Sequence, residues 1–278
     1  MTEVASSPAA TRPLPVALLS EARPKQWLKN VLVFVAPAAA GVLEQSDELS
    51  RALLAFVAFC TAASGTYFLN DVADVEADRR HPSKRYRPIA AGEIPLALGR
   101  LIGVALILGS VAIGATCNLR LAAVVAAYVV LTTLYSSWLK HIAVVDLAAV
   151  AAGFLLRAAG GAAATEVPIS SWFYIVASAA SVFVVAGKRL AELRAGGERA
   201  SDTRAALAAY SVAYLGYVLA VSSGIAILAY CLWAFEEADL VVDGAVWLEL
   251  SSVPFVLGLL RYALLIQPCR SRRLMALR

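Results

Sequence analysis

The sequence predicts an all-α polytopic membrane protein, and three observations support this prediction. Of the 278 residues, 60% are apolar and only 16% are charged, whereas a soluble domain has about 45–50% apolar and about 25% charged residues. The mean hydropathy is +0.73. The apolar residues gather in runs long enough to cross a bilayer. This composition excludes a disordered chain, a coiled coil and an ordinary soluble enzyme.

Eight apolar runs predict eight membrane-spanning helices. The first run is short for a span and the seventh is long. The apolar stretch from Leu14 to Leu19 is too short for the core of a signal peptide, so we expect a short helix on the membrane surface there. The predicted spans cover residues 28–43, 51–70, 96–117, 119–138, 142–163, 171–190, 205–234 and 245–266.

The basic residues orient these spans. With the N-terminus in the cytoplasm, 19 of the 24 Lys and Arg residues fall in inner segments and only Arg51 and Arg120 in outer loops. Because Lys and Arg are enriched on the cytoplasmic side, we expect a multi-pass protein of the plasma membrane with a cytoplasmic N-terminus. We expect an interfacial segment (1–26), one transmembrane catalytic domain (27–266) and a basic tail (267–278).

An acidic motif follows the second span. Asp71, Asp74 and Asp78 are spaced i, i+3 and i+7, so they share one face of a helix that continues from this span. Carboxylate oxygens suit Mg²⁺, which commonly bridges one or two carboxylates and substrate phosphates. A solvated acidic loop is the alternative, but the periodic spacing at the end of a span argues against it. We therefore predict a Mg²⁺ site at these three aspartates, flanked by Asn70.

A basic loop comes next, with Lys84, Arg85 and Arg87 between Pro82 and Pro88. The positive-inside rule explains part of this charge. Beside a metal–phosphate site, the same side chains would bind phosphate oxygens, and arginine can do so through two parallel hydrogen bonds. We predict that these three basic residues bind phosphate.

A second charged motif, Lys188, Arg189 and Glu192, ends the sixth span. The predicted topology puts it on the same side of the membrane as the acidic motif, so we expect a two-sided anion pocket. A pair of basic side chains that reach for the membrane surface is the alternative.

Three further residues are substrate-binding candidates on this side. Tyr135 and Lys140 end the fourth span, and Asp146 lies about one turn into the fifth. Ionisable side chains within spans are costly and usually face a cavity or a partner.

At these residues the chain resembles the UbiA superfamily of intramembrane prenyltransferases. Asn70, Asp71, Asp74 and Asp78 match its motif N-D-x-x-D-x-x-x-D. The resemblance implies an all-helical membrane fold of nine spans, of which the ninth is missing or altered here. In the general family a second aspartate-rich motif also binds Mg²⁺ on a prenyl diphosphate, whereas the second motif of this chain is cationic.

Three segments resemble one branch of that superfamily: R-P-K-Q-W-L-K-N at 23–30, the H-P-S-K-R-x-R-P loop and the G-K-R-x-x-E motif. That branch transfers 5-phosphoribose from 5-phosphoribosyl 1-diphosphate to a polyprenyl (decaprenyl) phosphate for cell-wall arabinan. The resemblance implies a Mg²⁺-dependent pentosyltransferase and adds Lys29 to the substrate-binding residues. The expected partners are these two substrates and the bilayer, without nucleic acid; a homo-oligomer is left open. The implied catalytic residues are Asp71, Asp74, Asp78, Lys188, Arg189 and Glu192.

Two other functions compete with this interpretation. A prenyltransferase acting on an aromatic or other small acceptor would need the second aspartate-rich motif. A lipid or polyanion transporter would place polar groups near the middle of the membrane, whereas the charges here gather on one side.

Overall fold

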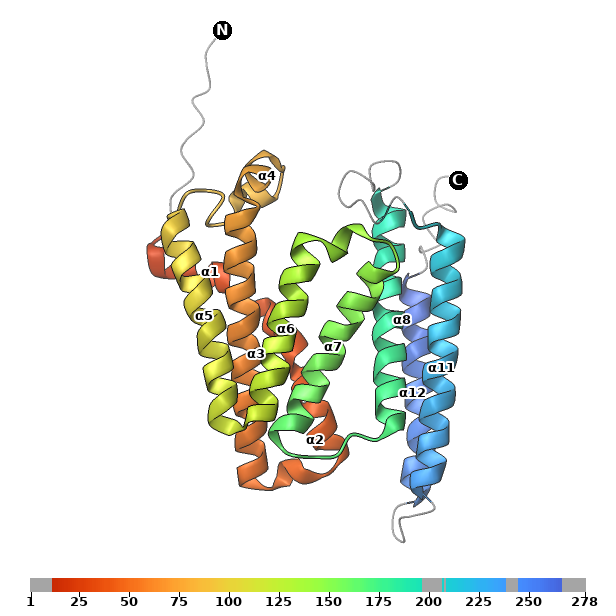
Figure 1. Ribbon diagram of the computed structural model, residues 1–278. Coiled ribbons are helices and arrows are strands. Elements are labelled where there is room, and N and C mark those ends of the chain that lie inside the picture. The colour runs from red at the N-terminus through yellow and green to blue at the C-terminus, as the bar shows by residue number, and fades with distance from the viewer. Residues whose placement is uncertain (1–11, 197–206, 208, 239–244, 267–278) are drawn as a thin grey trace, which may run out of the picture. The chain divides into compact units, whose positions relative to one another are not determined.

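The computed structural model describes residues 12–196, 207, 209–238 and 245–266. The chain forms two compact units, residues 1–130 with 157–167, and residues 131–156 with 168–278. Figure 1 shows the helices along the chain, and each unit has its own hydrophobic cluster. The predicted basic tail lies outside the described residues.

Seven helices of the described part are long and apolar enough to cross a membrane. They correspond to the last seven predicted spans, and α5 and α12 have the predicted bounds. Both α6 and α7 continue from one unit into the other. The seven helices are α3 (Ser46–Ala73), α5 (Leu96–Cys117), α6 (Leu119–Ser137), α7 (Val145–Ala164), α8 (Ser171–Gly196), α11 (Val212–Ala238) and α12 (Ala245–Ile266).

The first predicted span, 28–43, differs from the prediction. The chain forms a 3-10 helix, η1 (Pro24–Phe34), followed by the short helices α2 (Val35–Ala39) and η2 (Val42–Glu44). Pro37 lacks the N–H that would bind the Val33 carbonyl in a continuous α-helix. At the rise of each helix type, η1 and α2 together extend about 30 Å, close to the thickness of a bilayer core. The prediction of an α-helical span here was therefore wrong in helix type.

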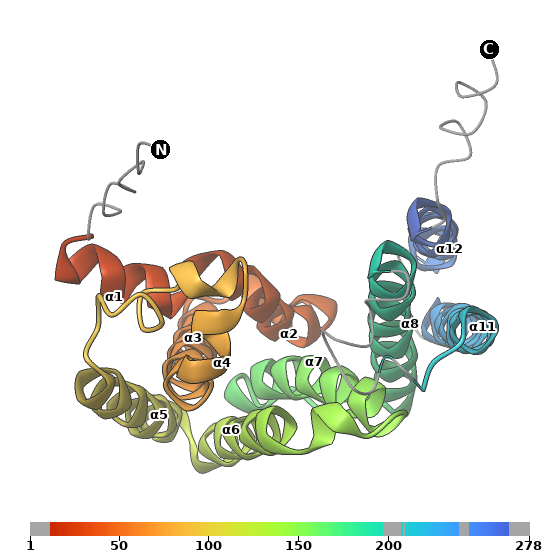
Figure 2. The ribbon, with the colours of Figure 1, turned by 90° about the horizontal axis from the view of Figure 1, so that it is seen from above.

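The first unit is built around α3, which packs against α5, α1 and η1. The buried face of α3 carries mostly Ala, Ser and Gly. At Gly65 a side-chain carbon would lie 2.9 Å from the Gly103 carbonyl oxygen of α5. Small residues allow helix backbones to approach closely in membranes, and α3 and α5 lie side by side in both views (Figures 1 and 2).

Arg157 of α7 is 7% exposed and belongs to a polar network inside this unit. Its Nε donates to Asn30 Oδ1 at 2.7 Å, and its Nη2 donates to the Tyr128 hydroxyl at 2.8 Å. The Asn30 amide donates to Cys60 Sγ at 3.2 Å. The network ties η1, α3, α6 and α7 together and accounts for the arginine within a predicted span.

The predicted surface helix is present as α1 (Leu14–Ala22). In the view along the long helices, α1 is seen from the side, so it lies across their direction (Figure 2). Ala17 of α1 packs with Phe68 and Val72 of α3 and with Ile89 and Ile94 of the basic loop region. This cluster joins α1 and the basic loop to the end of α3 that carries the acidic motif.

In the second unit, α8 packs against α11, and α11 packs against α12. Leu147 of α7, Val185 and Leu190 of α8, and Leu215 of α11 form its buried cluster with Tyr210. The cluster lies beside the charged end of α8 and fixes α7 and α11 there.

The close approach of α7 to η1 predicts that Gly161 cannot carry a side chain. An added carbon at Gly161 would lie 1.7 Å from the Val33 carbonyl oxygen, whereas one at Gly109 of α5 would meet nothing within 4 Å. Gly161→Ala should lower the free energy of unfolding by about 1–3 kcal/mol or more. Gly109→Ala should change it little. Thermal unfolding of both variants in detergent checks this prediction, and equal unfolding temperatures would contradict it.

Candidate active site

The acidic motif straddles a break between two helices. α3 ends at Ala73, and α4 (Val75–Arg80) begins after Asp74, whose φ and ψ are −92° and 8°. The hydrogen bonds from Asp74 N to Asn70 O and from Asp78 N to Asp74 O, both 2.9 Å, keep the two helices in close register. The prediction of one continuous helical stripe is corrected to a stripe interrupted at Asp74.

The three aspartates around this break differ in solvent exposure. Asp71 and Asp78 are buried, with 4% and 2% exposed, while Asp74 is exposed. One nitrogen of Arg87, Nη1, donates to Asp71 Oδ1 at 3.0 Å and to Asp78 Oδ2 at 2.6 Å. Lys84 Nζ lies 3.8 Å from Asp78 Oδ1. The structure therefore brings the basic loop onto two of the three predicted metal ligands.

The remaining predicted residues of the first unit differ in exposure. Asn70 is half-buried, and Lys29 of η1 is exposed. Arg85 is also exposed and stacks on the ring of its neighbour Tyr86, with 4.8 Å between the guanidinium carbon and the ring centroid. Arg85 thus points to a different partner from Arg87.

Sequence reasoning missed two members of the cluster, Arg23 and Glu21. Arg23 Nη2 donates to Asp71 Oδ2, and the guanidinium lies 4.6 Å from the ring centroid of Tyr67. Glu21 is 1% exposed. Burial, with the neighbouring Asp71, raises the pKa of Glu21 to about 8. The one signal in the sequence was an acidic residue inside an otherwise apolar short segment, directly before the R-P-K-Q-W motif.

Local backbone geometry aims Arg23 at α3. Arg23 ends α1 with φ at 53°, a left-handed conformation that few non-glycine residues adopt. Ser64 of α3 holds both sides of this turn, because its hydroxyl donates to the Ala22 carbonyl at 3.0 Å and accepts the Trp27 indole N–H at 3.1 Å. The R-P-K-Q-W motif thus serves to dock its arginine on Asp71.

The second motif, in the other unit, is organised by Arg189. Its Nε donates to Asp146 Oδ2 at 2.7 Å and its Nη2 to Asp146 Oδ1 at 3.0 Å, a two-point pair with both side chains nearly inaccessible. The Tyr135 hydroxyl donates to the same Asp146 Oδ1 at 2.8 Å. Arg189 Nη1 donates to Glu192 Oε2 at 2.9 Å. Asp146 therefore buttresses Arg189 rather than facing open space.

The two lysines of this region are more accessible. The Lys188 side chain is 64% exposed, and its Nζ lies 3.8 Å from Glu192 Oε1. Lys140 lies in the 3-10 helix η4 (Leu139–His141) and is half-buried. Lys188 presents its ammonium group to the surroundings, while Arg189 is held in place.

A strained turn positions Asp146. Val144 has φ at 69°, which is a genuine outlier for a β-branched residue. Its N–H donates to the hydroxyl of Tyr210 at 2.7 Å. Asp146 follows two residues later in the first turn of α7. The hydrogen bond from Val144 to Tyr210 therefore stabilises the turn that positions Asp146 against Arg189.

The acidic cluster is chemically suited to a hard cation. Within the described residues, no three His, Cys, Asp or Glu side chains lie close enough to hold a metal by themselves. Mg²⁺ does not require this, because it commonly uses one or two carboxylates with substrate phosphates and waters. The buried oxygens of Asp71 and Asp78 already accept cationic guanidinium groups, so this donor set fits a divalent cation.

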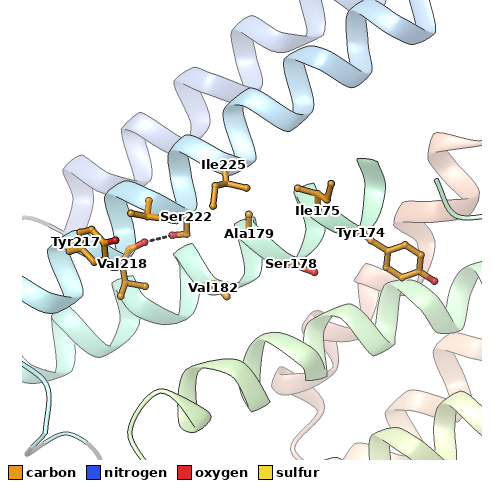
Figure 3. Close-up of a pocket in the computed structure, with 10 residues that line it drawn as sticks. Tyr174, Ile175, Ser178, Ala179, Val182, Tyr217, Val218, Ser222 and Ile225 are labelled. Atoms are coloured by element: carbon orange, nitrogen blue, oxygen red, sulfur yellow. Dashed lines mark hydrogen bonds between the residues drawn. The ribbon is translucent and has the colours of Figure 1, made fainter. Parts of the chain in front are cut away.

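An apolar pocket of about 550 Å³ lies between α8 and α11. Figure 3 shows residues from both helices around it, including Ala179, Val218 and Ile225. The Ser222 hydroxyl there donates to the Val218 carbonyl of its own helix at 2.6 Å. The pocket has no charged side chain in its lining, so it suits a hydrocarbon and offers no phosphate-binding group.

Comparisons with known proteins agree with this chemistry. The profile of the UbiA prenyltransferase family matches residues 31–274. The chain is 41% identical to decaprenyl-phosphate phosphoribosyltransferase of Corynebacterium glutamicum, over 88% of this chain and 75% of that protein. It is also 41% identical to the Mycobacterium tuberculosis protein of that name, over 94% of this chain and 86% of the relative.

Solved structures show the same fold. A UbiA homolog from Archaeoglobus fulgidus bound to DMAPP and Mg²⁺ matches with a TM-score of 0.70 and 17% identity, over 90% of this chain and 86% of that one. A structure described for digeranylgeranylglyceryl phosphate synthase matches with a TM-score of 0.63 and 12% identity, over 91% of this chain and 96% of that one.

Because Asp146 holds Arg189 in place, Asp146→Asn should lower the stability of the folded protein strongly. Removing one partner of a buried ion pair leaves an uncompensated charge, which costs about 3–5 kcal/mol. The variant should unfold at a lower temperature in detergent than the unsubstituted protein. Glu192→Gln is the matched control, since this carboxylate is partly exposed and its loss should cost about 1 kcal/mol or less. An Asp146→Asn variant as stable as the control would contradict the buttress role.

Proposed function

The chain belongs to the UbiA prenyltransferase family, and we propose that it transfers 5-phosphoribose from 5-phosphoribosyl 1-diphosphate to a polyprenyl phosphate, releasing diphosphate. The observation that carries the proposal is the chemistry of the second motif, where Lys188 and a buttressed Arg189 take the place of a second aspartate cluster. A cationic motif suits a phosphate-bearing acceptor. Relatives at 41% identity bear the name decaprenyl-phosphate phosphoribosyltransferase, and decaprenyl phosphate is the acceptor that name specifies.

The acidic cluster would hold Mg²⁺ for the diphosphate of the donor. Asp71 and Asp78 would be its buried ligands and Asp74 the exposed one at the helix break. When bound, Mg²⁺ supplies Lewis-acid stabilisation of charge on the departing diphosphate. Asn70, at the end of α3, orients the same group. The neighbouring UbiA homolog bound to DMAPP and Mg²⁺ supports a divalent metal in this fold.

The basic loop binds the remaining phosphate charge of the donor. Arg87 already lies between Asp71 and Asp78, and Lys84 lies beside Asp78. Their charges offset the repulsion that a phosphate would meet next to carboxylates. Arg85 and Lys29, both exposed, complete the set proposed for the 5-phosphate.

The second motif holds the acceptor phosphate. Arg189 is fixed by Asp146 and Tyr135, and its side chain is only 2% exposed, so it adds positive charge behind the phosphate instead of a free fork. Lys188 adds an accessible ammonium group, which Glu192 orients at 3.8 Å. Lys140, in the segment between α6 and α7, contributes further positive charge.

The reaction needs positioning more than proton transfer. A non-bridging oxygen of the lipid phosphate, anionic at neutral pH, forms a bond to C1 of the ribose. The bond from C1 to the diphosphate oxygen breaks, and its electron pair leaves with diphosphate. The product is a polyprenyl-phosphoryl 5-phosphoribose. Residues of both motifs lower the barrier by binding and orienting charged groups.

The distribution of basic residues supports a reaction on the cytoplasmic side of the membrane. With 19 of 24 basic residues on one predicted side, the N-terminus and both motifs face the cytoplasm, where a water-soluble phosphoribosyl donor is available. The membrane is the plasma membrane, and the lipid product serves the synthesis of cell-wall arabinan, as in arabinogalactan.

A direct assay tests this function. Purified protein in detergent, supplied with Mg²⁺, labelled 5-phosphoribosyl 1-diphosphate and a polyprenyl phosphate, should produce a labelled lipid, and chelation with EDTA should stop it. Absence of labelled lipid, together with consumption of a prenyl diphosphate and an aromatic acceptor, would instead identify a prenyltransferase.

The metal role predicts that Asp71→Asn lowers kcat by roughly 100-fold or more, since loss of metal-assisted charge stabilisation is worth several kcal/mol. Glu76→Gln is the matched control on α4. Its side chain is 73% exposed and pairs with Arg79, so activity should stay close to that of the unsubstituted protein. Initial rates in the lipid assay measure both variants. Similar rates for the two would remove Asp71 from the metal site.

A further inference from the structure

Two arginines donate hydrogen bonds to Asp71 at the same time. Arg87 donates to its Oδ1 and Arg23 to its Oδ2, and only 4% of the residue is exposed. A cation that binds the carboxylate must therefore compete with these guanidinium groups. Each displaced guanidinium loses a charge-assisted hydrogen bond. The side chains of Arg23 and Arg87 are only 24% and 28% exposed, so a nearby acceptor favours the exchange.

Arg87 keeps an acceptor in Asp78 Oδ2, which its Nη1 already contacts at 2.6 Å, while Asp78 Oδ1 is left for the cation. The corresponding acceptor for Arg23 is Glu21. Glu21 Oε1 lies 4.0 Å from Arg23 Nη2. Within the described part of the chain, no donor makes a hydrogen bond of normal geometry to either oxygen of this buried carboxyl, which lies beside the Asp71 carboxylate and the Ile89 backbone N–H. Buried polar groups without partners are rare and require an explanation.

We propose that Glu21 is a positioning residue that receives the guanidinium of Arg23 when the metal and diphosphate occupy Asp71. This exchange rests on the proposed role of Asp71 in metal binding. It gives the buried carboxyl of Glu21 a function, since its oxygens accept the hydrogen bond that Arg23 loses. No backbone movement is needed.

The residues around Arg23 favour a short movement of its side chain without a change in the backbone. A charge-assisted N–H···O bond is about 2.8 Å long, so a shift of about 1 Å brings Arg23 from its present 4.0 Å into contact with Glu21. Ser64 holds the Ala22 carbonyl before Arg23 and the indole of Trp27 after it. The ring of Tyr67 covers the face of the guanidinium and leaves its N–H edge free to exchange partners.

Metal affinity in a double-mutant cycle tests the exchange. The variants are Glu21→Met, which removes the acceptor oxygens, Arg23→Met, which removes the donors, and the double variant. The free Mn²⁺ signal in electron paramagnetic resonance gives the apparent Kd for Mn²⁺, measured on the full chain in detergent with 5-phosphoribosyl 1-diphosphate present. Thermal unfolding in EDTA establishes that each variant is folded.

Glu21→Met should weaken Mn²⁺ binding about tenfold, the effect of one lost hydrogen bond to a charged group. Glu21→Gln keeps an acceptor oxygen and should bind within about twofold of the unsubstituted protein. In the Arg23→Met background, Glu21→Met should have no further effect, because no guanidinium remains to be received.

Two results would overturn the exchange alone. Unchanged Mn²⁺ affinity in Glu21→Met would show that Glu21 merely fills space. A tenfold loss that persists in the Arg23→Met background would make Glu21 a direct metal ligand. Absence of Mn²⁺ binding by the unsubstituted protein would overturn the proposed function and the exchange together.

Discussion

Charged side chains buried inside a largely apolar molecule dictate how both units of this chain are organised. A carboxylate or guanidinium in a poorly hydrated setting is tolerated only with an opposite charge and good hydrogen bonds. Asp71 meets this condition through Arg23 and Arg87, and Asp146 meets it through Arg189. The same ion pairs that stabilise the folded chain also hold in place the groups proposed to bind phosphate and metal. Under the proposed function, stability and substrate binding are therefore coupled at each cluster.

The fold supplies rigid supports for these groups. The small residues of α3 let α5 and η1 approach closely, so the helix that ends in the acidic motif has little room to move. Ser64 then fixes the turn that carries Arg23. In the other unit, Asp146 and Tyr135 hold Arg189. Side chains at the ends of long helices therefore act from fixed positions, which favours electrostatic catalysis over large movements.

The sequence predicted the spans well because bilayer thickness dictates long apolar runs, and the bounds of α5 and α12 agree with the prediction. Periodicity could not predict the interruption at Asp74, because i, i+3 and i+7 spacing assumes one unbroken helix. It also could not predict the 3-10 geometry of Pro24–Phe34, because 3-10 and α-helices share similar apolar patterns over so short a segment. Glu21 escaped notice because its importance comes from burial against α3, a tertiary property. The roles of the aspartates and basic residues in catalysis remain predictions.

The strained turn at Val144 has a consequence for communication within the second unit. The hydroxyl of Tyr210, directly before α11, holds this residue at positive φ. If α11 were displaced, the turn would relax toward an ordinary conformation and Asp146 would rotate away from Arg189. The position of Arg189 is therefore coupled to that of α11 through Tyr210, which lies 66 residues beyond Val144. Under the proposed function, a lipid or neighbouring protein that shifts α11 would change the affinity for the acceptor without touching the charged residues.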